Sequence, residues 1–173
     1  MCVIIIKPRG VEMPPKYELK RAAMHNPHGF GFVSSGGVYM RTMDFDSFYK
    51  EVKKVGKDEC CIMHLRIATH GSHKMDNCHP FKKGDIYFAH NGVLDIRPHG
   101  DMTDSETAFQ DILYPAAVEH GLGSPEFSLV VKRIIGRSKF AFMQGGHIWM
   151  FGRFIEFNGL YYSNLYHHYA YAF

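Results

Sequence analysis

The hydrophobic and polar positions of this chain follow two different periods, one typical of strands and one typical of helices. Short apolar or alternating runs predict strands over residues 3–6, 30–33, 38–41, 60–67, 85–90, 139–143, 147–151 and 160–163. Apolar residues at helical spacing predict helices over residues 16–25, from 42 or 44 to 55, 103–121 and 124–135. The aromatic segment 166–173 fits neither period and has no assignment.

The order of these elements indicates the fold class. Strands come first, helices cluster in the middle and strands return, so the chain lacks the regular alternation of a doubly wound parallel sheet. We expect an α+β sandwich in which mainly antiparallel sheets are stacked with helices outside, formed by residues 1–173 as one domain. The uninterrupted apolar run Val3–Ile6 predicts a strand that is buried on both faces.

Local signals predict several element ends. Thr103-Asp104-Ser105-Glu106 has the pattern of a capping box and places Asp104 in the first turn of a helix. Ser124-Pro125 predicts another helix start, and Asn26 is expected to end the first helix because asparagine tolerates a left-handed conformation. The long polar segment after residue 67 is of the length that usually serves a function.

Composition and charge then limit the classes of protein. The chain has 173 residues, 46% of them hydrophobic, and a formal net charge of +3, which argues against a nucleic-acid partner. Its four cysteines have no CxxC spacing, which favours free thiols in a reducing compartment. The first apolar run stops at Lys7, and no run approaches the length of a membrane span. We therefore expect a soluble cytoplasmic protein without metal, cofactor or membrane partner.

Cys2 is the first candidate for chemistry. If Met1 is removed, Cys2 carries both a thiol nucleophile and a free α-amine. The α-amine has an ordinary pKa of about 7.7–8.0, so it can act as a general base near neutral pH. A small residue in second position is common, however, and Cys2 by itself is more often inert than catalytic.

Four further blocks change that view. In chain order they are His64-Leu65-Arg66-Ile67-Ala68-Thr69-His70-Gly71, Asn77-Cys78-His79-Pro80-Phe81, Phe88-Ala89-His90-Asn91-Gly92-Val93-Leu94 and Thr103-Asp104-Ser105-Glu106. Together with Cys2, and over most of residues 2–110, they resemble the glutaminase domain of class II glutamine amidotransferases, which are N-terminal nucleophile hydrolases. The remaining residues, 111–173, resemble that family only loosely, through the ending Tyr162-Ser163-Asn164.

The resemblance implies a glutamine substrate and a role for each matching residue. Cys2 would attack the side-chain amide and form a γ-glutamyl thioester, while its own α-amine moves the protons. Asn91 and the backbone N–H of Gly92 would form the oxyanion hole. Arg66 would bind the α-carboxylate of glutamine and Asp104 the α-ammonium. Thr69 and His70 would complete the substrate-binding site.

Each residue also has a plain structural explanation. Arginine at a strand end is commonly a surface charge, aspartate in a first helical turn stabilises the helix, and Asn-Gly is a frequent hairpin turn. The histidines at 64, 70, 73, 79 and 90 lie near three cysteines in sequence, so a zinc site is a rival. Their spacing lacks a known ligand pattern, and we interpret them as hydrogen-bonding scaffolding. Cys78-His79 is a weaker alternative catalytic pair.

Two departures from the family widen the choice of substrate. Better-known members have Thr-Arg-Trp where this chain has Leu65-Arg66-Ile67, and many carry an acidic residue where His28 stands. We expect a stand-alone glutaminase that supplies ammonia to a separate synthetase or acceptor protein. The alternatives are a related hydrolase of another γ-glutamyl or small amide, and a ligand-binding domain of the same fold without turnover.

Overall fold

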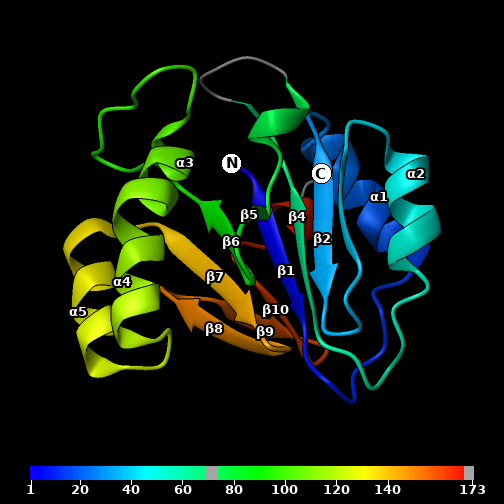
Figure 1. Cartoon of the computed structure of the whole chain (residues 1–173). Coiled ribbons are helices and arrows are strands. Elements are labelled where there is room, and N and C mark those ends of the chain that lie inside the picture. Colours follow the sequence, from blue (N-terminus) through cyan, green and yellow to red (C-terminus); the bar gives the residue numbers. More distant parts are fainter. Residues whose placement is uncertain (69–73, 170–173) are drawn as a thin grey trace.

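The structure is a computed structural model that describes residues 1–68 and 74–169. Two antiparallel sheets lie against each other, and helices cover their outer faces (Figure 1). The described helical segments are α1 Lys16–His25, α2 Phe45–Val52, η1 Met75–Asn77, α3 Asp104–Ala108, η2 Phe109–Leu113, α4 Tyr114–His120, α5 Pro125–Ile134 and α6 Tyr166–Tyr169.

The larger sheet has six strands in the order β3-β2-β4-β1-β10-β9, and the smaller has four in the order β5-β6-β7-β8. Their bounds are β1 Val3–Lys7, β2 Phe30–Ser34, β3 Tyr39–Thr42, β4 Cys61–Leu65, β5 Phe81–Lys83, β6 Ile86–Asn91, β7 Lys139–Gln144, β8 His147–Phe151, β9 Ile155–Phe157 and β10 Leu160–Tyr162. All of the described strand pairs are antiparallel.

Three apolar clusters give this arrangement its layers. One cluster, which includes Leu19 and Phe48, packs α1 and α2 on the outer face of the six-stranded sheet. A second, which includes Phe109 and Phe127, packs α3 to α5 on the outer face of the four-stranded sheet. The third lies between the two sheets and includes Ala141. The molecule is therefore an α-β-β-α sandwich, as the sequence predicted.

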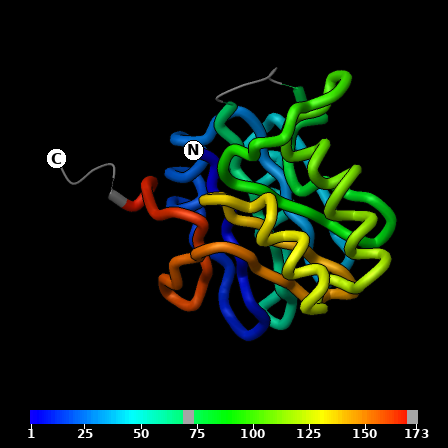
Figure 2. Tube along the Cα trace, turned by 90° about the vertical axis from the view of Figure 1, so that its left-hand side faces the viewer, coloured from blue at the N-terminus to red at the C-terminus, as the bar shows by residue number. Residues whose placement is uncertain are grey.

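The first strand lies at the centre of the layers. Val3 and Ile5 belong to the cluster under α1 and α2, whereas Ile4 and Ile6 belong to the cluster between the sheets. Strand β1 pairs with β4 on one side and with β10 on the other, so burial on both faces is confirmed. Figure 2 shows the N-terminal end of the chain close to the segment after β10. The apolar run thus fixes the position of Cys2.

The predicted helix ends hold in part. Thr103 accepts a hydrogen bond from the Glu106 backbone, and Ser124 accepts one from the Phe127 backbone, as the capping patterns predicted. Helix α2 ends at Val52, three residues before the predicted end. Asn26 ends α1 with φ −136°, so the predicted left-handed conformation is wrong there. Its side chain instead donates to the Ala22 carbonyl, which satisfies a free acceptor of the last turn.

Four short elements were missed by the sequence pattern. They are η1, β5, β9 and α6, each of three or four residues. Strands β5 and β9 lie at sheet edges, where little burial is needed and the apolar pattern is weak. The helix from Thr103 to Gly121 also contains a π-helical turn at Phe109–Leu113, which a regular helical period does not predict.

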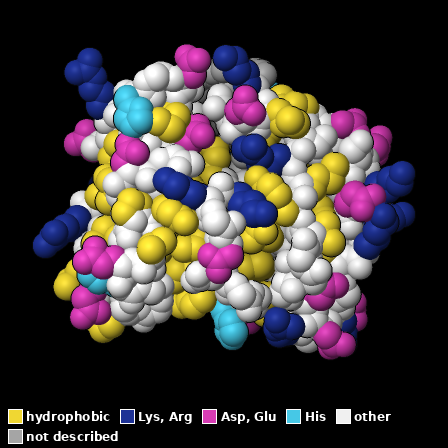
Figure 3. All heavy atoms as spheres, in the orientation of Figure 1, with side chains coloured by type: hydrophobic (Ala, Val, Ile, Leu, Met, Phe, Trp, Pro, Cys, Tyr) yellow, Lys and Arg dark blue, Asp and Glu magenta, His cyan; other side chains and the backbone are white. Residues whose placement is uncertain are grey.

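The surface agrees with the low net charge. Figure 3 shows acidic and basic side chains interspersed with apolar ones over one face. Among the helices that the structure describes, none is long and apolar enough to cross a membrane.

Candidate active site

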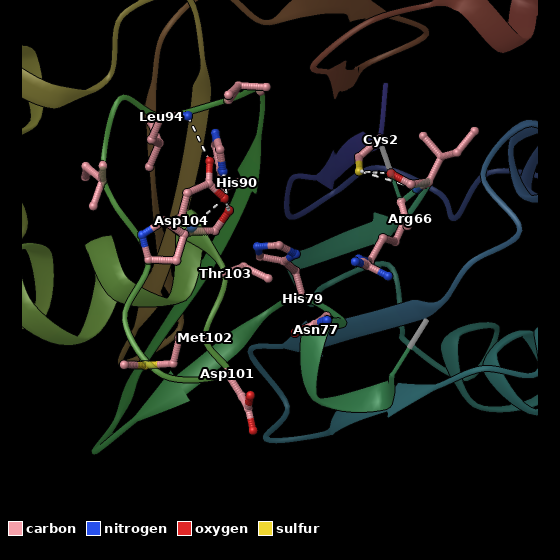
Figure 4. Close-up of a pocket in the computed structure, with 17 residues that line it drawn as sticks. Cys2, Arg66, Asn77, His79, His90, Leu94, Asp101, Met102, Thr103 and Asp104 are labelled. Atoms are coloured by element: carbon pink, nitrogen blue, oxygen red, sulfur yellow. Dashed lines mark hydrogen bonds between the residues drawn. The ribbon is translucent and has the colours of Figure 1, made fainter. Parts of the chain in front are cut away.

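A cavity of about 430 Å³ lies at the end of the sheets where β1 begins. Its lining brings together Cys2, Arg66, Gly92 and Asp104, which are far apart in sequence. Figure 4 shows Cys2 and Arg66 on one side of this space, and Leu94 and Asp104 on the other. Four of the sequence-predicted site residues thus share one cavity.

Cys2 lies directly before β1, and its thiol contacts the backbone of Ile67. The sulfur lies 3.4 Å from both the Ile67 amide nitrogen and the Ile67 carbonyl oxygen. Burial raises the pKa of the Cys2 thiol, although the Ile67 amide opposes that effect. A buried thiol of raised pKa is mostly protonated at neutral pH, so it needs a nearby base to become a nucleophile.

Arg66 follows directly after β4, where the chain leaves the sheet. Its backbone N–H donates to the Gly29 carbonyl, and its own carbonyl accepts from the His28 N–H, so two bonds fix its position. The side chain is 5% exposed, which contradicts the interpretation of Arg66 as a surface charge. Among the described residues, no carboxylate forms an ion pair with Arg66, and its Nη1 has no hydrogen-bond partner. A buried cation in this state favours an anionic ligand.

Asp104 is the first residue of α3, as the capping box predicted. One carboxylate oxygen accepts from the Leu94 backbone at 2.8 Å, and the other accepts from the Ser105 backbone at 2.7 Å. The helix-stabilising role is therefore real. Because a carboxylate offers about four lone-pair sites, it keeps capacity for a ligand ammonium in the cavity.

Asn91 and Gly92 lie at the end of β6. The chain continues from them toward α3 and returns only at β7, so this Asn-Gly pair is not a hairpin turn between paired strands. Gly92 has φ +146°, and a Cβ added there would lie 2.2 Å from the Ser138 hydroxyl oxygen. Only glycine fits this close approach. The Asn91 side chain is buried and donates to the Ser163 hydroxyl at 2.8 Å.

Three neighbouring histidines lie at the cavity, where His79 and His90 belong to its lining, and they differ in their hydrogen-bond partners. His64 donates from Nε2 to the His90 carbonyl at 3.1 Å, and His90 Nδ1 lies 2.6 Å from the Ser105 hydroxyl. These two act as hydrogen-bonding scaffolding, as interpreted from the sequence. His79 departs from that interpretation, because neither ring nitrogen has a hydrogen-bond partner among the described residues. Its ring is tilted by 42° against that of His64 at a ring-centroid distance of 4.4 Å, and it lines the cavity.

Burial also sets the charge of these rings. It lowers the pKa of His64 to about 3 and that of His90 to about 4, although the carboxylate of Asp104 opposes the shift at His90. The pKa of His79 is also well below its usual range, chiefly because the ring is buried. The three rings are therefore neutral at physiological pH.

His28 supports a segment that lines the cavity, a role that the sequence did not reveal. Its Nδ1 accepts a hydrogen bond of 2.9 Å from the Ala68 backbone, so the ring supports the segment that carries Arg66 and Ile67. A carboxylate at this position could accept the same hydrogen bond. His28 and Ala68 are 40 positions apart in the sequence, so only the folded chain brings them together, and no local sequence pattern predicts the contact.

The remaining predictions concern Thr69, His70 and the Cys78-His79 pair. Thr69 and His70 lie outside the described residues. Cys78 lies 3.7 Å from the Met43 sulfur and packs against Gly29, whereas His79 lines the cavity. The two side chains thus lie in different surroundings, which disfavours a catalytic Cys-His pair.

The described residues contain one group with the spacing of a metal site, formed by Glu18, His167 and His168. Its members lie on α1 and α6 and are not among the residues that line the cavity. Arg21 donates to Nδ1 of His168 at 3.0 Å, and the Tyr162 hydroxyl donates to Glu18. Two of the three candidate ligands therefore already have protein partners, and a cation beside His168 disfavours a metal ion there.

Comparison with known proteins gives the family of this chain. The family model described as Glutamine amidotransferases class-II matches residues 45–139. The chain belongs to this family of enzymes, which hydrolyse the side-chain amide of glutamine. Among solved structures, it is similar to the glutamine phosphoribosylpyrophosphate (PRPP) amidotransferase from B. subtilis complexed with ADP and GMP. The TM-score is 0.60 at 17% identity, over 94% of this chain and 41% of that chain. This likeness shows the N-terminal nucleophile hydrolase fold.

Proposed function

We propose that this chain hydrolyses the side-chain amide of free glutamine through a thioester on Cys2, and delivers ammonia to a separate acceptor protein. The thiol adds to the amide carbonyl, and the amide nitrogen leaves as ammonia once it is protonated. Water then attacks the thioester, which releases glutamate and restores the thiol. Asn91 and the Gly92 N–H stabilise the oxyanion in both steps.

The observation that carries this proposal is the position of Arg66 and Asp104 on opposite sides of the cavity that contains Cys2. A free amino acid presents a carboxylate and an ammonium on one carbon. A buried guanidinium that has no carboxylate partner in residues 1–68 and 74–169 suits the first group, and a carboxylate at the opposite wall suits the second. We also assign Thr69 and His70 to substrate binding, on the family resemblance alone.

The base in this mechanism is the α-amine of Cys2. The buried histidines are poor candidates for that role, because their low pKa values leave the rings neutral and weakly basic. The nitrogen of Cys2 is an amide while Met1 precedes it, and an amide has no useful basicity. The proposal therefore requires that Met1 be removed.

The proposed acceptor protein would receive the ammonia that this chain releases. The chain spans 41% of the length of the solved amidotransferase that it matches. Ammonia released into water is protonated and lost as a nucleophile. We therefore propose that a synthetase or another acceptor protein binds near the cavity.

The decisive experiment compares two preparations of the same chain. One is made with a cleavable tag that leaves Cys2 first, and the other retains Met1. We expect glutamate release from glutamine only in the first, because only that preparation has a free α-amine beside the thiol. Circular dichroism and thiol titration confirm that both preparations are folded and carry the same thiols. Equal activity in the two would exclude the N-terminal nucleophile mechanism.

A second candidate substrate is suggested by one wall of the cavity. Ile67 lines the cavity, as do Leu94, Ile96 and Met102, so part of the lining is apolar. Leu65, the other departure from the family, is buried in the core cluster under α1 and α2 and is absent from the cavity lining. A γ-glutamyl compound with an apolar substituent suits the wall at Ile67. A panel of glutamine, γ-glutamyl amides and small amides, scored by amide release, separates the two substrates.

A further inference from the structure

The chain directly after β10 contacts both halves of the proposed catalytic apparatus. Ser163 and Asn164 make side-chain hydrogen bonds to the segment that begins with Cys2 and to Asn91. Strand β10 neighbours β1 in the six-stranded sheet, whereas Asn91 ends β6 in the other sheet (Figure 1). The pair Ser163-Asn164 therefore connects the two sheets at the end where the cavity lies.

The first set of contacts fixes the nucleophile. The Ser163 hydroxyl accepts from the Ile4 N–H at 2.8 Å, and the Ser163 N–H donates to the Ile4 carbonyl at 2.9 Å. The Asn164 side-chain amide donates to the Cys2 carbonyl at 2.7 Å. These bonds continue the pairing of β1 with β10 past Tyr162, where the strand ends. Without such bonds the first residues of a chain are commonly poorly ordered. Here they include Cys2, the proposed nucleophile, so these bonds fix its position.

The second contact fixes the proposed oxyanion donor. Nδ2 of Asn91 donates to the Ser163 hydroxyl oxygen at 2.8 Å. A side-chain amide has two N–H bonds, so this contact occupies one and sets the direction of the other. The same hydroxyl oxygen thus accepts from both Ile4 and Asn91, which uses its two lone pairs.

We propose that Ser163 and Asn164 are positioning residues that hold the Cys2 segment and the Asn91 amide in one fixed geometry for attack on the substrate carbonyl. This inference rests on the proposed function of Cys2 and Asn91. Misplacement of a reacting group by about 1 Å typically costs on the order of 10²-fold in rate, so a shared anchor for nucleophile and oxyanion donor has a direct kinetic effect. Neither residue is among those that line the cavity that contains Cys2, so we expect their loss to affect kcat more than KM.

The test uses the mature protein with Cys2 first. Ser163→Ala removes the shared acceptor, and Asn164→Asp replaces the donor to Cys2 by an acceptor of the same size. We expect kcat for glutamate release to fall about 10- to 100-fold in each variant, with KM for glutamine changed less than about threefold. Ser163→Thr keeps the hydroxyl and should recover most of the lost kcat.

A matched control separates positioning from a loss of stability. Ser124→Ala also removes a hydroxyl that accepts a backbone N–H, but at the start of α5. It should lower the melting temperature and leave kcat unchanged at an assay temperature where the protein is folded. If Ser163→Ala retains the kcat of the unmodified enzyme, or if Ser124→Ala lowers kcat as much at an equal loss of melting temperature, the positioning role is overturned.

A second readout does not need turnover. The pH midpoint for alkylation of Cys2 by iodoacetamide, read by peptide mass, reports how tightly the buried thiol is held. Because burial raises the pKa of Cys2, a loosened segment should shift this midpoint downward in Ser163→Ala and Asn164→Asp. An unchanged midpoint overturns the inference even if the unmodified enzyme releases no glutamate, a result that by itself would refute only the proposed function.

Discussion

Buried polar groups near the two ends of strand β1 differ in whether they have hydrogen-bond partners. At the end away from the cavity, Lys7 is fully buried, and its ammonium donates to the carbonyls of Gly56 at 2.8 Å and Lys57 at 3.0 Å, and also to that of Glu59. At the end next to the cavity, several buried nitrogens have no hydrogen-bond partner among the described residues. They are Nη1 of Arg66, both ring nitrogens of His79 and Nε2 of His90.

This difference distinguishes a structural polar site from a functional one. Buried polar groups cost free energy unless they are paired, so an end that serves only the fold satisfies its donors internally, as Lys7 does. An end that binds a ligand leaves groups unpaired until the ligand arrives. The predictions below should therefore separate the two ends: changes at Lys7 should affect stability, and changes at the cavity should affect catalysis.

The largest effect is expected at Gly92. In Gly92→Ala the new methyl group would meet the Ser138 hydroxyl at 2.2 Å, so the backbone N–H must move away from the oxyanion position. Loss of one such donor typically costs about 10²–10³ in kcat. Steady-state kinetics of glutamate release measure it. Gly136→Ala is the control, since Gly136 also has a positive φ but no atom within 4 Å of the added Cβ. A similar kcat loss in both variants would contradict the oxyanion role.

A smaller effect is expected at Arg66. Arg66→Lys keeps the charge but loses the planar fork that binds a carboxylate with two parallel bonds. Hydrogen bonds to charged groups are worth about 1.5–3 kcal/mol each, so KM for glutamine should rise about 10- to 100-fold with a lesser change in kcat. Initial rates over a range of glutamine concentrations test this. An unchanged KM removes Arg66 from the substrate site.

At the other end of β1, the expected effect is on stability alone. Lys7→Met keeps an unbranched side chain that is one atom shorter, but it leaves the carbonyls of Gly56, Lys57 and Glu59 without this donor, which should lower the free energy of unfolding by about 2 kcal/mol. Urea unfolding measures the loss, while kcat at a temperature where the variant is folded should stay unchanged. A lower kcat in the folded variant would contradict the inference that Lys7 serves only the fold.

The effect that is smallest for one histidine and one pH unit is a dependence of stability on pH. An unfolded histidine binds a proton near pH 6.5, whereas burial delays protonation to about pH 4 at His90 and about pH 3 at His64. Between those values the unfolded state binds more protons, so the free energy of unfolding should fall as the pH falls below 6.5. Each such histidine contributes up to about 1.4 kcal/mol per pH unit.

Urea unfolding at pH 7, 6 and 5 checks this slope. His64→Gln keeps a donor for the His90 carbonyl but does not titrate, so its slope should be shallower than that of the unmodified protein. His147→Gln changes an exposed histidine and serves as the matched control. Equal slopes in the unmodified protein and in His64→Gln would contradict the buried neutral state.

Much of the fold followed from the sequence, because local interactions and burial specify it. The apolar run Val3–Ile6 became a strand buried on both faces, and Thr103 and Ser124 cap helices where their patterns predicted. The resemblance to a family also led to Cys2, Arg66, Gly92 and Asp104, which line one cavity. Their chemical roles stay predictions until kinetics test them.

Other features were decided only by the tertiary structure. The edge strands β5 and β9 carry a weak apolar pattern, since they need little burial and gain their hydrogen bonds from a neighbour. His28 meets the Ala68 backbone, and Ser163 meets Asn91 72 positions away in sequence. Such contacts leave no periodic signal, because each depends on which backbone or side chain the packed sheets bring within about 3 Å. The sequence supplied the reactive residues, and the packing of the two sheets determined which groups hold them in place.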